Sequence, residues 1–322
     1  MTTLCVTSLS TGAGKTTISA GLAIHWQAAG RKIGYLKVVL GATSPNTDGQ
    51  FMKELLLLPE AADANAPAFV SESQLYTDIR GMVEKVAADK DIVLVECSSE
   101  NAVGIAKAVA AKIIVVADYS EMATVSRICK PLNACVVINK VPVSQLGPAR
   151  VENAVAFRNE GLTVAGILPE NRTLLTFTVA DLVKTIDGQL LNNPEKASET
   201  VENVMLGAMT VDSGLPYYSR KSGKAVVVRA GRPDMAMAAL ETPTRALVLA
   251  GKAPAIPQVR NKAEDKGIPV VTTELDVQTV ATRLENAVLK IRFNQQSKLP
   301  EVLAMMNEGM EFAELSRFTG IR

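Results

Sequence analysis

The sequence predicts an α/β protein in which a doubly wound, mostly parallel sheet is followed by a smaller α/β domain. Three observations lead to this expectation. Short apolar runs alternate with segments of helical periodicity through the first half, and parallel strands need crossover helices of this kind. The alternation restarts near residue 178. Hydrophobic residues make up 48% of the 322 residues and aromatic residues only 4%, which is typical of Ala- and Val-rich strands buried between helical layers.

The first half is expected to hold six strands, at residues 4–7, 32–39, 92–96, 113–117, 134–138 and 162–167. Helical segments fall between most of them, including residues 16–29, 73–88 and 102–111. Parallel strands point their carboxyl ends to one edge of a sheet, and open sheets of this type bind ligands at that edge. Residues that follow these strands are therefore the first candidates for a functional site.

The second half is expected to form a separate, smaller domain. A helix starts at Thr178 and stops at Asp187-Gly188, and further strands and helices follow at residues 225–228, 234–240, 246–250, 262–266 and 269–272. The chain then becomes polar before a helix at residues 299–307. We therefore predict a first domain at residues 1–177, a second at residues 178–292 and a C-terminal helical tail at residues 293–322.

A glycine-containing loop, Ser10-Thr11-Gly12-Ala13-Gly14-Lys15-Thr16-Thr17, lies where the first strand meets the first helix. Glycine permits the backbone path that turns several amides toward one anion, and the helix adds its free N-terminal amides. In such a phosphate-binding loop, or P-loop, the lysine reaches the outer phosphates and the hydroxyl binds Mg²⁺. The pattern predicts that ATP contacts Thr11, Gly12, Ala13, Gly14, Lys15, Thr16 and Thr17, although Leu9 replaces the first glycine of the usual motif.

Two acids are candidates to complete a magnesium site with Thr16. Glu96 ends the strand at residues 92–96, and Asp48 precedes the helical run at residues 51–57. Mg²⁺ prefers hard oxygen ligands, and both carboxylates are expected near the edge of the sheet that carries the loop. The alternative for each is a solvated surface acid.

Lys37 closes the second strand and is expected to place a cation at the same edge. Lys15 and Lys37 are the candidate catalytic residues, because two cations can stabilise charge on a transferring phosphoryl group. The alternative for Lys37 is a solvated lysine at a strand end. Asn139 and Lys140 follow the fifth strand, where a side-chain amide can both donate to and accept from a base. Both are therefore candidate nucleotide contacts.

Charge and composition narrow the class of partner. The 34 basic and 33 acidic residues leave a net charge of +1, which gives no electrostatic reason to expect nucleic acid or an anionic membrane as a partner. The start of the sequence lacks the pattern of a signal peptide, and no apolar run is long enough to span a membrane. Four cysteines without a paired motif fit buried thiols in a reducing compartment. We therefore expect a cytoplasmic protein.

Taken together, these segments resemble a known pair of domains. Residues 14–16, 35–37, 48–52, 95–96, 139–142 and 166–170 are similar to the dethiobiotin-synthetase-like P-loop domain. Residues 201–209, 230–234 and 238–242 resemble a DRTGG domain, with the signature changed to Gly231-Arg232-Pro233-Asp234. The pair resembles the N-terminal region of long phosphotransacetylases and their stand-alone homologues. The resemblance implies ATP and Mg²⁺ as ligands of the first domain, and a regulatory second domain with an unidentified second small ligand.

The resemblance leaves three functions open. The chain is a nucleotide-binding regulator, an ATP-dependent carboxylate-activating ligase of the dethiobiotin or cobyrinic acid a,c-diamide synthetase type, or a structural protein with a vestigial loop. Cys97-Ser98-Ser99-Glu100 stands where dethiobiotin synthetases carry a glycine-rich substrate loop. Only Asp48 remains of the acid pair that many members carry, because Asn46 takes the other place. These departures favour the regulator, with weak or no ATP hydrolysis.

A homo-oligomer is also expected, built largely through the second domain. Residues 205–209 are apolar and contain a glycine that suits close backbone approach. The tail places Leu299, Val302, Leu303 and Met306 at helical spacing, and such a stripe must be buried against some surface. The alternative is that the tail folds back on its own domain.

Overall fold

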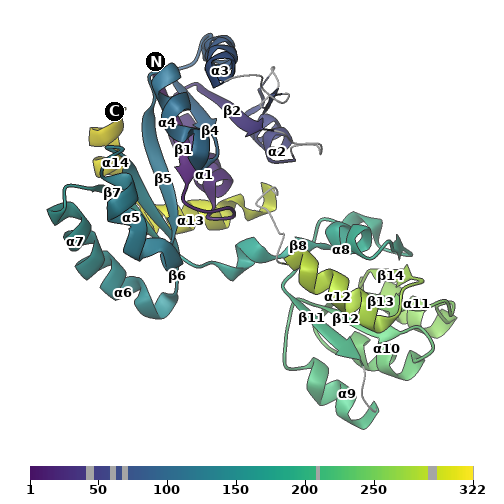
Figure 1. Cartoon of the computed structure of the whole chain (residues 1–322). Coiled ribbons are helices and arrows are strands. Elements are labelled where there is room, and N and C mark those ends of the chain that lie inside the picture. Colours follow the sequence, from purple (N-terminus) through teal and green to yellow (C-terminus); the bar gives the residue numbers. More distant parts are fainter. Residues whose placement is uncertain (41–46, 59–62, 67–71, 208–210, 289–295, 322) are drawn as a thin grey trace. The chain divides into compact units, whose positions relative to one another are not determined.

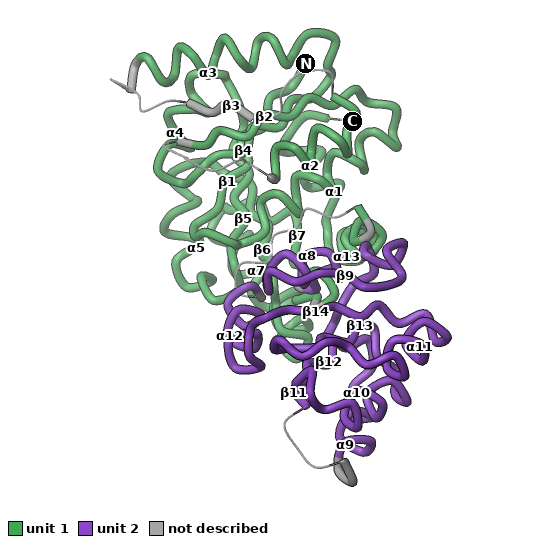
Figure 2. Tube along the Cα trace, turned by 90° about the vertical axis from the view of Figure 1, so that its right-hand side faces the viewer, with its two compact units in different colours: residues 1–174, 292–322 green, residues 175–291 purple. Residues whose placement is uncertain are grey.

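The computed structural model describes residues 1–40, 47–58, 63–66, 72–207, 211–288 and 296–321. The chain divides into two compact units, which Figure 2 shows in different colours. The first unit comprises Met1–Leu174 with Arg292–Arg322, and the second comprises Leu175–Ile291. The second unit is thus inserted in the chain of the first, and the residues expected to form a separate tail belong to the first unit.

The first unit contains a seven-stranded sheet in the order β3-β2-β4-β1-β5-β6-β7, and every neighbouring pair is parallel (Figure 1). Its strands are β1 (Thr2–Ser8), β2 (Ile33–Leu40), β3 (Asp63–Ala66), β4 (Ile92–Glu96), β5 (Lys112–Asp118), β6 (Cys135–Val141) and β7 (Thr163–Pro169). The expected parallel sheet is confirmed, and β3 is an additional edge strand that the apolar pattern did not indicate.

Helices cover both faces of this sheet because its side chains alternate between two cores. Leu4 and Val6 of β1 enter one core, and Cys5 enters the other. The first core includes residues of α1 (Lys15–Ala28), α2 (Thr47–Leu56), α13 (Leu299–Gly309) and α14 (Phe312–Thr319). The second includes residues of α3 (Glu72–Ala87), α4 (Ser99–Ala108), α5 (Met122–Cys129) and α7 (Ala154–Asn159). The short α6 (Leu146–Pro148) follows β6.

The C-terminal helices complete the first unit. Met306 and Val302 of α13 lie so close to Gly21 of α1 that a side chain at position 21 would collide with the Met306 sulfur. Beyond α13, Met310 bridges to Gly166 of β7, and the Glu311 amide donates to the Ala165 carbonyl at 2.7 Å. The apolar stripe of the tail is therefore buried on α1 and β7 within the first unit, rather than offered to another molecule.

The second unit holds a five-stranded sheet in the order β11-β12-β13-β14-β9, in which only β9 is antiparallel to its neighbour. The strands are β9 (Gln189–Leu190), β11 (Asn203–Gly207), β12 (Lys224–Arg229), β13 (Thr244–Ala250) and β14 (Val270–Thr273). One core contains residues of α8 (Val179–Thr185) and α12 (Val277–Val288), and the other contains residues of α9 (Val211–Tyr218), α10 (Pro233–Leu240) and α11 (Pro257–Asp265). A separate pair joins β8 (Phe177–Thr178) to β10 (Thr200–Val201).

The segment at residues 205–209 was expected to contact another copy of the chain. Its residues up to Gly207 belong to β11. Gly207 pairs in register with Val228 of β12, and the Tyr218 hydroxyl leaves no room for a β-carbon at position 207. The close approach that the glycine permits is therefore internal to the second unit. Ala208 and Met209 lie outside the described residues. The homo-oligomer remains a prediction, but neither Met205–Gly207 nor the tail supports it.

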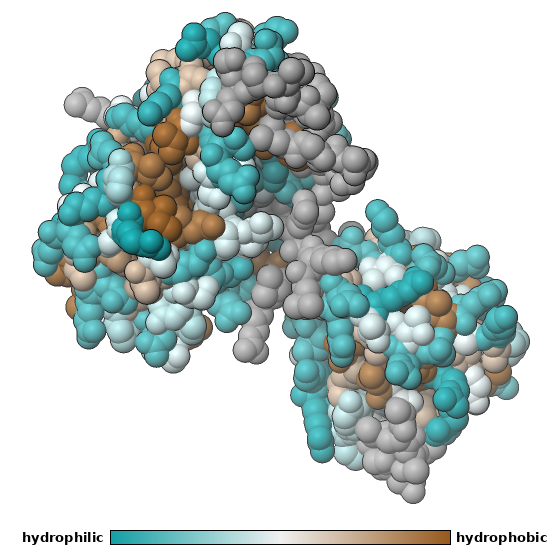
Figure 3. Space-filling model, viewed as in Figure 1, coloured by the Kyte–Doolittle hydropathy of each residue, from teal (hydrophilic) through white to brown (hydrophobic). Residues whose placement is uncertain are grey.

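An apolar patch is visible on the first unit in Figure 3, where Figure 1 shows α4 and β5. A cavity of about 690 Å³ lies there, lined by Val103, Lys107, Ile113, Leu132 and Phe318 among others. It lies at the amino end of β5, whereas the glycine-containing loop follows the carboxyl end of the parallel strand β1. The cavity is therefore separate from the expected nucleotide site.

In the part of the chain that the structure describes, no helix has the length and hydropathy of a membrane span.

Candidate nucleotide and magnesium site

The loop between β1 and α1 depends on glycine at two positions. Gly12 has φ +83° and Gly14 has φ +105°, in the left-handed region that side chains disfavour. A β-carbon at Gly12 would meet open space, but one at Gly14 would lie 2.3 Å from Asn139 Nδ2. Gly14 also opens α1, since its carbonyl accepts from the Ile18 amide at 3.0 Å. Gly14 thus combines a conformational and a steric requirement, whereas Gly12 has only the first.

Asn139 holds the loop in place. Its Nδ2 donates to the Ala13 carbonyl at 2.8 Å, and both residues are buried. The contact joins β6 to the loop after β1, two strands away in the sheet. The structure therefore shows Asn139 as a support of the loop, a use that the sequence did not indicate. Its expected contact with a nucleotide base remains a prediction.

We predict that Gly14→Ala destabilises the protein more than Gly12→Ala. Each alanine must adopt a left-handed backbone, at a cost of about 1–2 kcal/mol. Only the alanine at position 14 must also push aside the Asn139 amide, which breaks its hydrogen bond to Ala13. Urea unfolding of the two variants measures the difference. Equal losses of unfolding free energy would show that the Asn139 contact contributes nothing to the loop.

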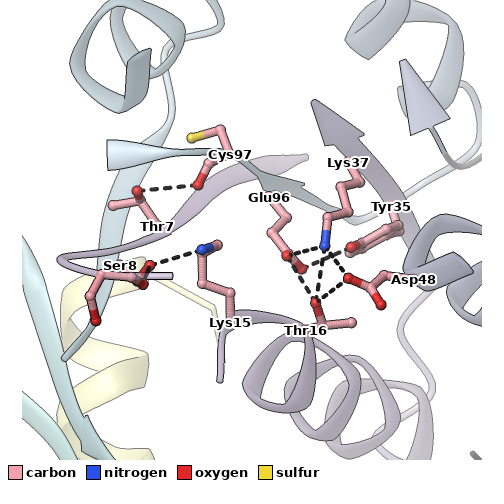
Figure 4. Close-up of polar contacts among 10 residues, drawn as sticks. Thr7, Ser8, Lys15, Thr16, Tyr35, Lys37, Asp48, Glu96 and Cys97 are labelled. Atoms are coloured by element: carbon pink, nitrogen blue, oxygen red, sulfur yellow. Dashed lines mark hydrogen bonds and ion pairs between the residues drawn. The ribbon is translucent and has the colours of Figure 1, made fainter. Parts of the chain in front are cut away.

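Lys15 begins α1 and turns back toward the end of β1. Its Nζ donates to Ser8 Oγ at 2.8 Å, and Ser8 Oγ donates to the Ser10 carbonyl at 2.6 Å (Figure 4). Burial lowers the pKa of Lys15, although the carboxylate of Glu96 acts in the opposite direction. The Lys15 ammonium is therefore desolvated without a bonded carboxylate, a state that a bound anion would relieve.

Four side chains meet beside the loop, as Figure 4 shows. Thr16 Oγ1 donates to Glu96 Oε1 at 2.9 Å and lies 3.5 Å from Asp48 Oδ2. Lys37 Nζ lies 2.6 Å from Asp48 Oδ2, 2.7 Å from Glu96 Oε1 and 3.2 Å from Thr16 Oγ1. The side chains of Asp48 and Glu96 are 7% and 1% exposed, so these are buried charges. The structure thus brings together the expected metal ligands and adds Lys37 to them.

The sheet register fixes this cluster. Lys37 of β2 is the direct partner of Glu96 of β4, so their side chains leave the sheet on the same face. Tyr35, two residues earlier on that face, donates its hydroxyl to Glu96 Oε2 at 2.8 Å and is fully buried. Burial alone would lower the pKa of Lys37, but the charges of Glu96 and Asp48 outweigh it, so that the pKa lies above its ordinary value. The Lys37 ammonium is therefore strongly held.

The donor set fits Mg²⁺ that arrives with phosphate ligands. The Thr16 hydroxyl lies within 3.5 Å of both carboxylates, and all three groups are hard oxygen donors. Mg²⁺ usually takes one or two carboxylates and completes its shell with water and phosphate. Among the described residues, no group of three or more His, Cys, Asp or Glu side chains is placed to hold a metal ion. Thr16, Asp48 and Glu96 would hold the ion, which would neutralise phosphate charge when bound.

The remaining candidate residues lie in the loop, in the first turn of α1 and near the end of β6. Thr11 is exposed at its tip, while Ala13 and Thr17 are buried. Lys140 lies at an irregularity of β6 with φ +58°, and its Nζ is 3.2 Å from Asp118 Oδ2. Burial raises the pKa of Asp118, but hydrogen bonds from Ser120 and the charge of Lys140 outweigh it and lower the pKa overall. Lys140 is thus bound to an acid at the carboxyl end of β5, and its contact with nucleotide stays a prediction.

Two residues of the site escaped the sequence analysis. Ser8 accepts from Lys15, and Tyr35 donates to Glu96. A signal existed for Tyr35, because residues two apart on a strand share a face and Lys37 was already a candidate. For Ser8 the signal was weaker, since a serine at the end of a strand is common in any loop.

Fold and site together define a P-loop NTPase-like protein, the class that binds nucleotides on a loop between a central parallel strand and a helix. Residues 2–176 match the family model of an AAA domain, and residues 181–287 match that of the DRTGG domain. The first match spans more than half of the chain, so the chain belongs to this AAA domain family, which includes dethiobiotin synthetase. The expected fusion of such a P-loop domain with a DRTGG domain is confirmed.

The solved structures that the chain matches have low sequence identity to it. The MinC:MinD cell division protein complex and the MinD protein of Aquifex aeolicus are 18% and 19% identical, each with a TM-score of 0.39. The matches cover 54% of this chain and 84% and 85% of those chains. The CBS and DRTGG domains of Clostridium perfringens pyrophosphatase, complexed with the activator diadenosine tetraphosphate, are 14% identical with a TM-score of 0.32, covering 58% of this chain and 82% of that one.

Proposed function

We propose that this chain is a cytoplasmic regulatory protein that binds ATP with Mg²⁺ at the P-loop and transmits the nucleotide state to or from its DRTGG domain, as the resemblance to phosphotransacetylase N-terminal regions suggests. The observation that carries the proposal is the convergence of Lys15, Thr16, Asp48 and Glu96 on one buried edge of the sheet. In this proposal Lys15 contacts the outer phosphates, and Thr16, Asp48 and Glu96 hold the ion.

The path of the chain supports a regulatory link between the two domains. The chain leaves the first unit after Leu174 and returns at Arg292. The buried Lys298 then donates its Nζ to the Leu174 carbonyl at 3.0 Å, which ties the two crossing segments together within the first unit. From there α13 packs on α1, the helix that begins with Lys15. A ligand that shifts the second domain could thus act on the helix that carries the P-loop.

The alternative function is an ATP-dependent ligase of the dethiobiotin type, for which Lys15 and Lys37 are the catalytic candidates. Two features oppose it. The helix α4 begins at Ser99, three residues after Glu96, where dethiobiotin synthetases carry a glycine-rich substrate loop. Lys37 is also engaged with two carboxylates rather than directed at an open substrate site. The regulator is therefore the better supported function.

Equilibrium binding and turnover assays on the full chain test the proposal. We expect saturable ATP binding that is strengthened by Mg²⁺, together with steady-state hydrolysis far below the typical enzyme value of about 10 per second. We also expect no dethiobiotin from the diamine, ATP and bicarbonate. Absence of ATP binding would refute the proposal as a whole. Rapid hydrolysis, or formation of dethiobiotin, would favour the ligase instead.

A further inference from the structure

Lys37 contacts every side chain assigned to the metal. Its Nζ lies 2.6 Å from Asp48 Oδ2, 2.7 Å from Glu96 Oε1 and 3.2 Å from Thr16 Oγ1. A fixed ammonium group therefore lies at the point where the hard oxygens of the site converge. The Lys37 side chain is only 14% exposed, so water screens its charge poorly.

A lysine ammonium and a divalent cation cannot both remain at these oxygens without strong repulsion. Repulsion between like charges grows as their separation shortens and as screening falls, and the ion carries twice the charge of the ammonium. Lys37 cannot withdraw far, because its backbone is paired with Glu96 in the sheet. A metal ion must therefore displace the ammonium while Lys37 stays nearby and finds another partner.

We propose that Lys37 is a tethered counter-cation that excludes Mg²⁺ from the nucleotide-free site, so that the ion enters only together with nucleotide. The proposal deepens the proposed function and rests on it for the identity of the ligands. Phosphate oxygens would supply the metal ligands that Thr16, Asp48 and Glu96 lack, and would give the displaced ammonium an anionic partner. By linkage, Mg²⁺ and nucleotide then raise each other's affinity by the same factor.

Metal affinity without nucleotide tests the proposal directly. Mn²⁺ serves as the probe, and its free concentration is read from the electron paramagnetic resonance signal of the hydrated ion. Lys37→Met should bind Mn²⁺ at least about tenfold more tightly than the natural chain, because one repelling charge is removed from the ligands. Lys37→Arg keeps the charge and should retain the weak binding of the natural chain.

The matched control is Lys15→Met, which removes a second lysine of the same site whose Nζ is bonded to Ser8 rather than to a carboxylate. It should raise Mn²⁺ affinity much less than Lys37→Met. Equal gains in the two variants would overturn the proposal, because they would reflect only the lost net charge. Unchanged binding in Lys37→Met would overturn it as well. Should the methionine variant not fold, Lys37→Gln is measured instead, with the same outcomes required.

Adding ATP to the same titration separates the two proposals. In the natural chain, ATP should strongly raise the affinity of the protein for Mn²⁺, after the Mn²⁺ bound by free ATP is subtracted. In Lys37→Met, ATP should raise this affinity less. If both proteins bind ATP and ATP raises their Mn²⁺ affinity equally, the role of Lys37 is overturned and the proposed function stays intact. A natural chain that binds no ATP refutes the proposed function, while tighter Mn²⁺ binding by Lys37→Met still supports exclusion of the metal by Lys37.

Discussion

Lys15→Met is expected to lower the affinity for ATP–Mg²⁺ by about ten- to a hundredfold. The variant loses a charge-assisted contact with phosphate, worth roughly 1.5–3 kcal/mol. The same change should raise the stability of the nucleotide-free protein. Burial lowers the pKa of Lys15, so the folded state disfavours its charged form. The cost of burying this charge is present at neutral pH. It decreases as the pH rises through the lowered folded pKa of Lys15 and is gone above the ordinary lysine pKa of the unfolded state. Calorimetry with ATP and thermal unfolding measure the two effects.

The control for Lys15 is Lys107→Met. Lys107 is an exposed lysine of α4 beside the cavity at the amino end of β5, away from the loop. This variant should change neither ATP affinity nor stability appreciably. ATP binding that survives Lys15→Met unchanged would remove the P-loop assignment. A loss of stability in Lys15→Met would instead show that its contact with Ser8 outweighs the burial of its charge.

Glu96→Gln is expected to lower the free energy of unfolding by about 3 kcal/mol or more. Glu96 is almost fully buried and accepts hydrogen bonds from Thr16, Tyr35 and Lys37. The amide keeps the shape of the side chain but leaves the Lys37 ammonium without its second carboxylate, and removing one partner of a buried ion pair costs about 3–5 kcal/mol. Urea unfolding of the full chain measures the loss. Glu100→Gln, at an exposed acid four residues later, should change stability by less than about 0.5 kcal/mol.

The double variant Lys37→Met/Glu96→Gln should recover part of this stability, because no Lys37 ammonium is then left without its second carboxylate, although Asp48 loses its contact with Lys37. The pH dependence has a defined sign. The folded pKa of Lys37 is raised, so the ion pair contributes fully below the ordinary lysine value of 10.5 and is lost as the pH rises through the folded pKa. The difference between Glu96→Gln and the natural chain should therefore be constant near neutral pH and decrease above about pH 10.5. A difference that stays constant as the pH rises through the folded pKa of Lys37 would contradict the role assigned to it.

Much of the fold and part of the site follow from local patterns. The P-loop is one contiguous segment, so its glycines, Lys15 and Thr16 were recognisable without any knowledge of their neighbours. The positions of Lys37 and Glu96 could be inferred because each ends a buried strand, and parallel strands end at a common edge. Strand β11 was missed because its apolar run is only three residues long and is flanked by Asn203 and Gly207, whose weak preference for strands is overridden by pairing with β12.

The sequence by itself determined the parallel sheet, the P-loop and the edge at which candidate side chains gather, because periodicity and glycine chemistry act over a few neighbouring residues. Tertiary structure alone decided which of those side chains touch. It placed Lys37 between Asp48 and Glu96, set the Asn139 amide against Gly14, and folded α13 onto α1 after the second unit. These contacts join residues far apart in the chain. They depend on strand order, register and the packing of individual side chains, which local backbone preferences do not specify.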